Sequence, residues 1–421
     1  MPKFVIQGST KLEGKVRIAG FKNAITPILA ATLLTDQTCR IENVPAISDV
    51  RRMLDLLKDL GAQIKQPDEH IVEVTCKDVA VEKLNRKAVK QMRSSILLLG
   101  PLLARFLRVD QFPEPGGCII GNRPLDTHFA ALRGIGAELE VDEGRGSYSL
   151  KAKKLKGGVI VLPEFSVTAT ENILMAAALA EGETVIRGAA VEPHVQDLIS
   201  FLKAMGADIS FTDQHEVRIR GVKKLHGATH RIIPDQLEIG TFAVAAAVTK
   251  GDIEMSEVLP KHLDAILLKL KQTGASVVLK NNTLRVSSNG TLNAFRLQAM
   301  PYPGFPTDLQ APFGLMATQS KGTSLIHDPM FEGRMGYVGE LVKMGANAVV
   351  CDPHRVLVTG PTPLYGTEIR SLDLRAGITL VLAGILAEGE TVIHDAEIVD
   401  RGYENIEDRL RKLGAKIKRV E

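Results

Sequence analysis

A short motif recurs six times along the chain, and it limits the possible folds more than any other feature. Each copy ends a helical pattern with Gly-Ala and continues into a strand-like alternation; the glycines are Gly61, Gly136, Gly206, Gly274, Gly345 and Gly414. A glycine in this place accepts the left-handed dihedral angles that end many helices. The spacings of 75, 70, 68, 71 and 69 residues predict six copies of one structural unit.

A longer identity supports the same repeat. Residues 180–186 (Ala-Glu-Gly-Glu-Thr-Val-Ile) recur unchanged as residues 387–393, three units later. Within one unit the pattern predicts a buried Ala-rich helix, a strand, an amphipathic helix and two further strands, over residues 170–180, 184–187, 195–205, 207–211 and 216–220. Each unit would be a small sheet that covers an inner helix. We therefore expect an α/β fold of two domains, each built from three units around shared inner helices.

The two ends of the chain indicate where the domains divide. The last unit stops after one strand, residues 416–420, whereas residues 4–18 supply strands that no helix precedes. The first segment should therefore complete the last unit. Residues 17–20 also align with residues 231–234, so we predict that the chain crosses between domains near residues 21 and 233. One domain then covers residues 22–233, the other covers residues 1–21 plus 234–421, and the two crossings form a hinge.

Charge and hydropathy exclude several classes of function. Lys and Arg number 52 against 49 Asp and Glu, a net charge of +3, which gives no cationic surplus for nucleic acid. No apolar run reaches the roughly 18 residues of a membrane helix, and no apolar signal region follows the first lysine. These features favour a cytoplasmic protein without nucleic-acid or membrane partners. They give no oligomeric state.

The four cysteines are spaced too widely for a disulfide framework or a zinc site, and no metal or cofactor is predicted. They are Cys39, Cys76, Cys118 and Cys351. The ordinary interpretation of each is a small buried side chain. Cys118 is the exception, because Gly116 and Gly117 before it predict a mobile loop with an exposed thiol, and nearby Arg123 favours the thiolate. We therefore interpret Cys118 as reactive.

Polar or charged residues stand at the predicted start of each inner helix: Lys22, Arg93, Thr168, Asp235, Asp308 and Arg375. Such residues are often simple caps. The cations Lys22, Arg93 and Arg375, however, oppose the helix dipole. Cations and free backbone N–H groups at helix starts attract anions, so we expect anionic substrates in a cleft between the domains.

Eight motifs spread over the whole chain resemble the UDP-N-acetylglucosamine 1-carboxyvinyltransferase family. They are Phe-Lys-Asn-Ala at 21–24, Met-Arg-Ser-Ser at 92–95, Pro-Gly-Gly-Cys through Asn-Arg-Pro at 115–124, Pro-Asp-Gln-Leu-Glu at 234–238, Phe-Pro-Thr-Asp at 305–308, Phe-Glu-Gly-Arg at 331–334, Asp-Leu-Arg-Ala at 373–376 and Asp-Arg-Gly-Tyr-Glu at 400–404. The resemblance implies two inside-out α/β barrels. It also implies transfer of the enolpyruvyl group of phosphoenolpyruvate to the 3-hydroxyl of UDP-N-acetylglucosamine, the committed step of peptidoglycan synthesis.

The resemblance further implies a role for each matching residue. Cys118 matches the acid, which can also add covalently to phosphoenolpyruvate, and Asp308 matches the base. Lys22, Arg123 and Arg401 match residues that hold the phosphate and carboxylate groups. The other implied substrate contacts are Asn23, Arg93, Asp235, Glu238, Met330, Phe331, Arg334 and Arg375, with Pro124, Leu125, Asp126, Ser166 and Val167 toward the uridine diphosphate.

Two of these assignments have structural alternatives. Asp235 and Glu238 are three residues apart and could form a capping box instead of contacting substrate. Phe331 and Arg334 could be loop packing. The chain also departs from the family twice: Thr168 stands where Gly is usual, and Glu164 stands where some relatives have Lys. We expect both changes to weaken or reshape nucleotide binding.

Two other functions are compatible with a sixfold α/β repeat. The sister shikimate enolpyruvyl transferases share the fold, but nothing in them matches the loop around Cys118. A ring-like DNA clamp would need a basic inner helical face, whereas the inner helices of this chain are rich in Ala and Leu. The UDP-sugar enzyme is therefore our preferred interpretation.

Overall fold

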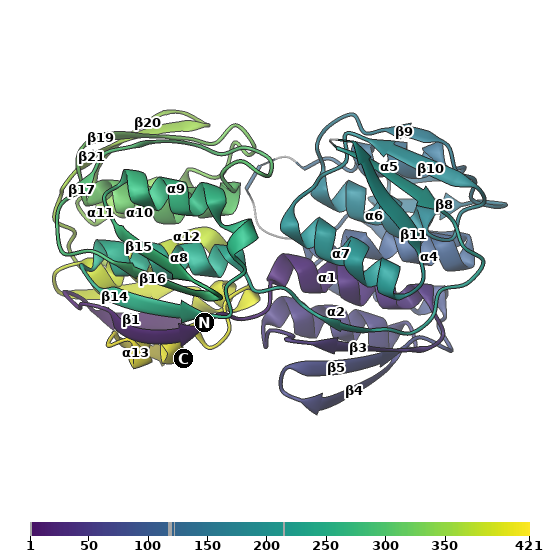
Figure 1. Cartoon of the computed structure of the whole chain (residues 1–421), viewed down its shortest axis with the longest axis horizontal. Helices are drawn as coiled ribbons and strands as arrows, with labels where there is room; N and C mark the ends of the chain where they lie inside the picture. Colours follow the sequence, from purple (N-terminus) through teal and green to yellow (C-terminus); the bar gives the residue numbers. More distant parts are fainter. Residues whose placement is uncertain (1, 117–119, 122, 214) are drawn as a thin grey trace. The chain divides into compact units, whose positions relative to one another are not determined.

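The computed structural model describes residues 2–116, 120–121, 123–213 and 215–421, which fall into two compact units (Figure 1). The continuous unit contains the described residues of 20–117 and 123–233. The split unit contains residues 2–19 and 234–421 together with Ile120 and Gly121. We predicted that the whole Cys118 loop belongs to the domain of residues 22–233, whereas Ile120 and Gly121 group with the split unit. The N–H of Gly333 donates to the carbonyl of Ile120 at 3.0 Å, which joins this segment to the split unit.

In the described part of the chain the strands form six sheets, three in each unit, which confirms the expected fold. The sheets of the continuous unit are, in spatial order, β13 (Thr229–Arg231), β3 (Thr38–Glu42), β5 (Ile71–Thr75) and β4 (Gln63–Asp68); β6 (Arg108–Pro113), β8 (Ser147–Lys151) and β7 (Glu138–Asp142); and β11 (Asp208–Asp213), β12 (Glu216–Arg220), β10 (Glu183–Arg187) and β9 (Val159–Val161).

The sheets of the split unit follow the same plan. They are β22 (Glu368–Arg370), β23 (Glu390–His394), β1 (Lys3–Gln7) and β24 (Lys416–Val420); β15 (Ser276–Lys280), β16 (Thr283–Ser287), β14 (Asp252–Ser256) and β2 (Glu13–Arg17); and β17 (Leu292–Asn293), β19 (Ser320–His327), β21 (Arg355–Gly360) and β20 (Asn347–Asp352), with β18 (Arg296–Gln298) also paired to β19. In Figure 1 most helices of each unit lie inside and the sheets lie around them, whereas α13 (Ile406–Lys412) is drawn at the outer edge of its unit.

Two kinds of helix fill the units, as the hydrophobic patterns predict. The inner helices are α1 (Lys22–Ala31), α4 (Leu99–Phe106), α6 (Val167–Ala177), α8 (Gln236–Val248), α10 (Gln310–Thr318) and α12 (Leu374–Leu386). The more polar helices are α2 (Ser48–Asp59), α3 (Arg86–Val89), α5 (Asp126–Gly134), α7 (Pro193–Ala204), α9 (Asp264–Gln272), α11 (Gly336–Lys343) and α13 (Ile406–Lys412). Every residue of α8 and α10 is buried, so these two helices lie in the core of the split unit with all of their faces covered.

The repeat glycines end their helices as expected. All six have positive φ angles, from 87° at Gly274 to 107° at Gly414. Two inner helices differ from the prediction, because short 3₁₀ helices at Arg93–Leu98 and Thr307–Leu309 precede α4 and α10. Pro101 and Pro312 are the third residues of those α-helices, within the first turn, where the missing N–H of proline leaves no bond unmade.

The first segment of the chain completes the last sheet, which confirms that prediction. Strand β1 lies between β23 and β24 and is antiparallel to both, with Phe4 opposite Ile393 and Arg419. Strand β2 then pairs in parallel with β14, and β13 pairs in parallel with β3. The two segments that connect the units therefore each end as an edge strand of one sheet.

Among the described cysteines, Cys39 and Cys76 are buried as expected. The expectation is wrong for Cys351, which is exposed because it lies on β20, an edge strand. Cys118 lies outside the described residues. No helix in the part of the chain that the structure describes has the length and apolar character needed to span a membrane.

Candidate active site

The predicted site residues fall into one group in each unit, and each group is considered separately. Cys118 is not among the described residues, so its predicted role stays a prediction. The group in the split unit centres on Asp308, and the group in the continuous unit contains Lys22, Arg93 and the starts of α5 and α6.

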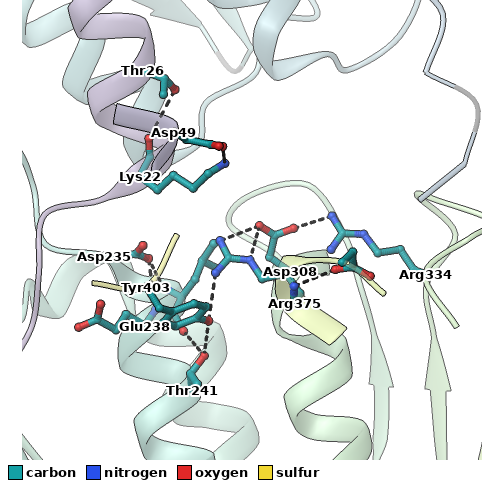
Figure 2. Close-up of polar contacts among 12 residues, drawn as sticks. Lys22, Thr26, Asp49, Asp235, Glu238, Thr241, Asp308, Arg334, Arg375 and Tyr403 are labelled. Atoms are coloured by element: carbon teal, nitrogen blue, oxygen red, sulfur yellow. Dashed lines mark hydrogen bonds and ion pairs between the residues drawn. The ribbon is translucent and has the colours of Figure 1, made fainter. Parts of the chain in front are cut away.

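Asp308 lies between two arginines (Figure 2). It belongs to the 3₁₀ helix that leads into α10, and its side chain is 19% exposed. The Nη2 atom of Arg334 lies 2.6 Å from Oδ1, and both Nε and Nη2 of Arg375 lie 3.0 Å from Oδ2. The sequence separations are 26 and 67 residues, and folding brings all three predicted site residues together. One carboxylate beside two guanidinium groups leaves a local positive charge, which suits an anionic ligand.

Arg375 is buried and has partners on both sides. Its Nη1 donates to the hydroxyl of Tyr403 at 3.1 Å, and its guanidinium carbon lies 5.6 Å from the centre of that ring. Burial opposes the charged form, but Tyr403, Asp308 and Asp235 together raise the pKa of Arg375 above its usual range. Arg375 is therefore a fixed cation.

Asp235 acts as the N-cap of α8. Its Oδ1 accepts from the N–H groups of Leu237 at 2.8 Å and Glu238 at 3.2 Å. Burial raises the pKa of Asp235 to about 7, Arg375 lowers it, and Glu238 raises it further. The capping alternative is thus half right. Glu238 does not complete a capping box: its Oε1 accepts from the N–H of Ala19 at 3.2 Å and pairs with Arg409.

The segment between β19 and α11 contacts the 3₁₀ helix that carries Asp308. The guanidinium carbon of Arg334 lies 5.1 Å from the ring centre of Phe331, a cation–π contact that supports the packing alternative for this pair. The N–H of Met330 donates to buried Asp328 at 2.9 Å, and Thr307 donates to the other oxygen of Asp328. Burial raises the pKa of Asp328. This network fixes the backbone that presents Arg334.

Arg401 ends the 3₁₀ helix Ala396–Arg401. The preceding residue, Asp400, accepts two hydrogen bonds from Arg419 of β24, at 2.9 and 2.7 Å. This bidentate pair ties the helix end to the sheet that β1 completes. It thereby positions the backbone next to Arg401.

In the continuous unit, Lys22 and Asn23 are the first two residues of α1. The ammonium group of Lys22 lies 3.1 Å from Oδ2 of Asp49, a buried residue in the first turn of α2 (Figure 2). A lysine ammonium has three donors, so two remain for a ligand. Asp49 was not identified from the sequence, since its spacing from Lys22 carries no motif.

Arg93 binds the chain on both sides of the Cys118 segment. Its Nη1 donates to the carbonyl of Pro115 at 3.4 Å, and its Nη2 donates to the carbonyl of Arg123. Burial lowers the pKa of Arg93. Arg93 therefore fixes the two stems of the loop, a role that the sequence alone did not indicate.

A buried histidine joins the starts of α5 and α6. His128 is 3% exposed, and burial, together with Arg93, lowers its pKa to about 3. The amide of Asn172 donates to Nδ1 at 3.0 Å, so the neutral ring carries its proton on Nε2 and donates it to Thr168, also at 3.0 Å. Thr168, one of the two departures from the family, thus gains a partner on α5.

Glu164, the second departure from the family, also has a hydrogen-bond partner in α5. Oε1 of Glu164 accepts from the hydroxyl of Thr127, one residue before His128, at 3.0 Å. The predicted uridine-side residues lie around these contacts. Leu125 and Asp126 begin α5, and Ser166 caps α6 by accepting from the N–H of Ala169. Val167 is the first residue of α6. The structure therefore brings Pro124, Leu125 and Asp126 onto one helix start and Ser166 and Val167 onto the next.

Comparisons with known proteins agree with this architecture. Residues 6–410 match the EPSP synthase (3-phosphoshikimate 1-carboxyvinyltransferase) family. The crystal structure of the enolpyruvyl transferase NikO from Streptomyces tendae has a TM-score of 0.90 at 24% identity, covering 100% of this chain and 99% of that one. EPSP synthase from Acinetobacter baumannii has a TM-score of 0.77 at 21% identity, covering all of both chains. The fold is that of the enolpyruvyl transferases.

Curated relatives narrow the class. UDP-N-acetylglucosamine 1-carboxyvinyltransferase of Koribacter versatilis (strain Ellin345) is 44% identical over 423 residues, covering 100% of this chain and 97% of the relative. UDP-N-acetylglucosamine 1-carboxyvinyltransferase 1 of Caldanaerobacter subterraneus subsp. tengcongensis is 44% identical over 99% of each chain. The chain belongs to the UDP-N-acetylglucosamine 1-carboxyvinyltransferase family.

Proposed function

We propose that this protein transfers the enolpyruvyl group of phosphoenolpyruvate to the 3-hydroxyl of UDP-N-acetylglucosamine and releases phosphate. The observation that carries the proposal is the 43–44% identity with relatives of that name over essentially the full chain. The reaction adds the sugar oxygen to C2 of phosphoenolpyruvate and a proton to C3, and then eliminates phosphate with loss of a proton from C3. It commits the sugar nucleotide to peptidoglycan synthesis, in the cytoplasm.

Asp308 is proposed as the base that takes the proton of the sugar hydroxyl. The two flanking arginines support this role in one respect, because they favour the ionised carboxylate. An ionised carboxylate has about four lone-pair positions, so it can accept from a sugar hydroxyl in addition to Arg334 and Arg375. The same arginines also make the carboxylate oxygens of Asp308 less basic. Their positions must therefore be controlled, because they decide how readily Asp308 accepts a proton.

Cations are proposed to hold the phosphate and carboxylate groups of phosphoenolpyruvate. Lys22 has donors to spare beyond Asp49, and Arg334 presents its guanidinium beside Asp308. Arg123 and Arg401 complete the set through the family resemblance. With so many fixed cations, charge neutralisation needs no metal ion.

Cys118 is proposed as the acid that delivers the proton to C3. Its assignment comes from the Pro-Gly-Gly-Cys motif alone. Asn23 is proposed to contact the sugar. The starts of α5 and α6 are proposed to receive the uridine diphosphate, where free helix N–H groups favour anions.

The test is an assay of phosphate release with phosphoenolpyruvate and each of two acceptors. Phosphate should appear with UDP-N-acetylglucosamine, should not appear with shikimate 3-phosphate, and should be unaffected by a chelator. Equal release with shikimate 3-phosphate would assign the chain to the sister reaction. A strict requirement for magnesium would contradict the charge-neutralising role of the cations.

A further inference from the structure

All three nitrogens of Arg375 contact acceptors within the protein. Two of them, Nε and Nη2, face Oδ2 of Asp308, and the third, Nη1, faces the hydroxyl of Tyr403. The whole residue is 4% exposed. Substrate binding by Arg375 stays a prediction, and its contacts in the folded protein also make it an anchor for Asp308.

Arg334 differs from Arg375 in this respect. One of its terminal nitrogens contacts Asp308, and its ring contact is with Phe331. Among the described residues, its buried Nε has no hydrogen-bond partner. Among the described residues, every guanidinium nitrogen of Arg375 therefore contacts an acceptor, whereas the Nε of Arg334 has no hydrogen-bond partner.

The hydrogen bonds beyond Arg375 run in one direction. The hydroxyl of Thr241 donates to the carbonyl of Leu237 at 2.9 Å, inside α8. Its oxygen must then accept the bond it shares with Tyr403, at 2.8 Å, and Tyr403 in turn accepts from Arg375. Each hydroxyl donates once and accepts once along this chain (Figure 2).

Burial makes this series of hydrogen bonds rigid. Tyr403 and Thr241 are each 1% exposed, so neither hydroxyl can exchange its partner for water. Leaving a buried donor or acceptor without a partner is unfavourable, which holds the three side chains in register. The segment before Tyr403 is itself tied to β24 through Asp400 and Arg419.

We propose that Tyr403 is a positioning residue: through Arg375 it fixes the direction and the charge state of the Asp308 carboxylate that accepts the sugar proton. The inference rests on the proposed function, because it assigns Tyr403 a task in that reaction. Tyr403 touches neither reacting group; it acts by keeping the guanidinium of Arg375 against one oxygen of Asp308. Among the described residues, Arg334 and Asp328 are further charged groups that act at Asp308.

The deciding variant is Tyr403→Phe, which keeps the ring under Arg375 and removes only the hydroxyl. Nη1 of Arg375 then lacks its acceptor, while the charge of Asp235 still acts on Arg375. Arg375 should turn away from Asp308. We expect kcat to fall about 10- to 100-fold, as small misplacements of catalytic groups do, with the KM for UDP-N-acetylglucosamine changed less than about twofold.

The pH profile separates this role from simple packing. If Arg375 withdraws, the carboxylate of Asp308 loses a neighbouring cation and binds a proton more readily. The acidic limb of the kcat profile should therefore move to higher pH in Tyr403→Phe. An unmoved limb, a limb moved to lower pH, or a rise in KM at unchanged kcat would each overturn the proposal, whatever the melting temperature.

Three controls complete the design. Tyr365→Phe removes the hydroxyl of a tyrosine that is 51% exposed and should behave like the wild type. Thr241→Val removes the acceptor of the Tyr403 hydroxyl and should shift the limb in the same direction by less, whereas Thr241→Ser should restore wild-type behaviour. The Thr241 pair also provides the test if Tyr403→Phe does not fold. A wild-type protein without phosphate release would refute the proposed function itself, and an active wild type with an unaltered Tyr403→Phe would refute only this inference.

Discussion

At the scale of single residues, Asp308 is held between two cations, Arg334 and Arg375. A carboxylate that accepts from two guanidinium groups is held in direction and kept ionised, but it also loses basicity. The balance depends on where Arg334 and Arg375 are placed. Substitutions at this carboxylate should therefore affect catalysis far more than binding.

The first prediction concerns Asp308→Asn, which keeps the shape of the side chain and removes its ability to accept a proton. Loss of a general base costs about 10²- to 10⁴-fold in rate, so turnover should fall by that range. Calorimetric titration should still detect UDP-N-acetylglucosamine. The control is Asp264→Asn at the exposed start of α9, which should leave both quantities unchanged. Lost binding with an intact circular dichroism spectrum would make Asp308 a binding residue.

The second prediction concerns the buried cap Asp235. Burial raises its pKa in the folded protein to about 7, above the ordinary value of 3.8. Between these two values the folded state holds a proton that the unfolded state has released, so this residue lowers the free energy of unfolding as pH rises from about 4 to 7. Asp235→Asn caps α8 equally well but does not titrate. Its stability relative to the wild type should improve by up to a few kcal/mol over that pH range.

Urea unfolding at several pH values measures this difference, with Asp264→Asn as the exposed control. A difference between Asp235→Asn and the wild type that stays constant from pH 4 to pH 8 would show that Asp235 does not titrate in this range. The comparison uses stability only. It is therefore independent of the role of Asp235 in the active site.

Sequence motifs predict which residues carry the chemistry, because a base, a cation or a cap must be a particular residue type. They did not reveal which side chains meet. Asp308 and Arg375 are 67 residues apart, and Arg375 meets Tyr403 across another 28. Tyr403 stood within a recognised motif but had no assigned role, and His128 had no signal at all. Such partners follow from the packing of inner helices, which the hydrophobic pattern specifies only as buried.

At the scale of elements, glycines in helices are either packing contacts or weak points. Gly314 of α10 and Gly339 of α11 belong to neighbouring helices of the same repeat. A Cβ at Gly314 would lie 2.2 Å from the hydroxyl of buried Tyr337, whereas a Cβ at Gly339 would have nothing within 4 Å. The two positions therefore form a matched pair.

The third prediction is that alanine has opposite effects at these positions. Gly314→Ala must displace the ring of Tyr337 and its hydrogen bond to Gln310, and should lower the free energy of unfolding by about 1–3 kcal/mol. Gly339→Ala should raise it by up to about 1 kcal/mol, because alanine favours the helix and meets no neighbour. Urea midpoints at constant m-value provide the measurement. Equal shifts at both positions would contradict the packing argument.

The sequence predicted the elements more accurately than their contacts. Strands β12 and β24 have the predicted bounds, and α6 and α7 begin within about three residues of theirs. The 3₁₀ helices at Arg93 and Thr307 were not predicted. The sequence does not show that Pro101 and Pro312 lie in the first turn of the α-helices that follow, because helix packing decides where those helices begin. The exposure of Cys351 was missed because an edge strand cannot be distinguished from a central one by its own residues.

At the scale of the whole molecule, catalysis should depend on groups from distant parts of the chain acting together. Cys118 precedes Arg123 by five residues in the sequence. Arg93 donates hydrogen bonds to the carbonyls of Pro115 and Arg123, which lie before and after Cys118 in the chain. The other described cysteines offer clear comparisons. Burial raises the pKa of Cys39 and raises that of Cys76 to about 11, so neither is reactive near neutral pH. Only Cys351 among them is exposed.

The fourth prediction is that a small epoxide phosphonate alkylates Cys118, and does so faster when UDP-N-acetylglucosamine is bound. The reagent resembles phosphoenolpyruvate in charge, and nucleotide binding should complete its site. Cys118→Asp should keep some turnover and escape alkylation, whereas Cys118→Ser, a much weaker acid, should lose most of its activity. Peptide mass mapping locates the adduct. Cys351→Ser removes the exposed competitor; an adduct on Cys39 or Cys76, or a labelling rate indifferent to the nucleotide, would contradict the prediction.

The placement of β1 between β23 and β24 has a consequence for how the protein is made. On the ribosome, every strand of the continuous unit has been synthesised once residue 233 is complete, so that unit can fold while the chain is still growing. The split unit cannot, because β1 must wait for partners that are translated more than 380 residues later, at 390–394 and 416–420. During that interval the strand Lys3–Gln7 has two unpaired edges, which expose the nascent chain to aggregation.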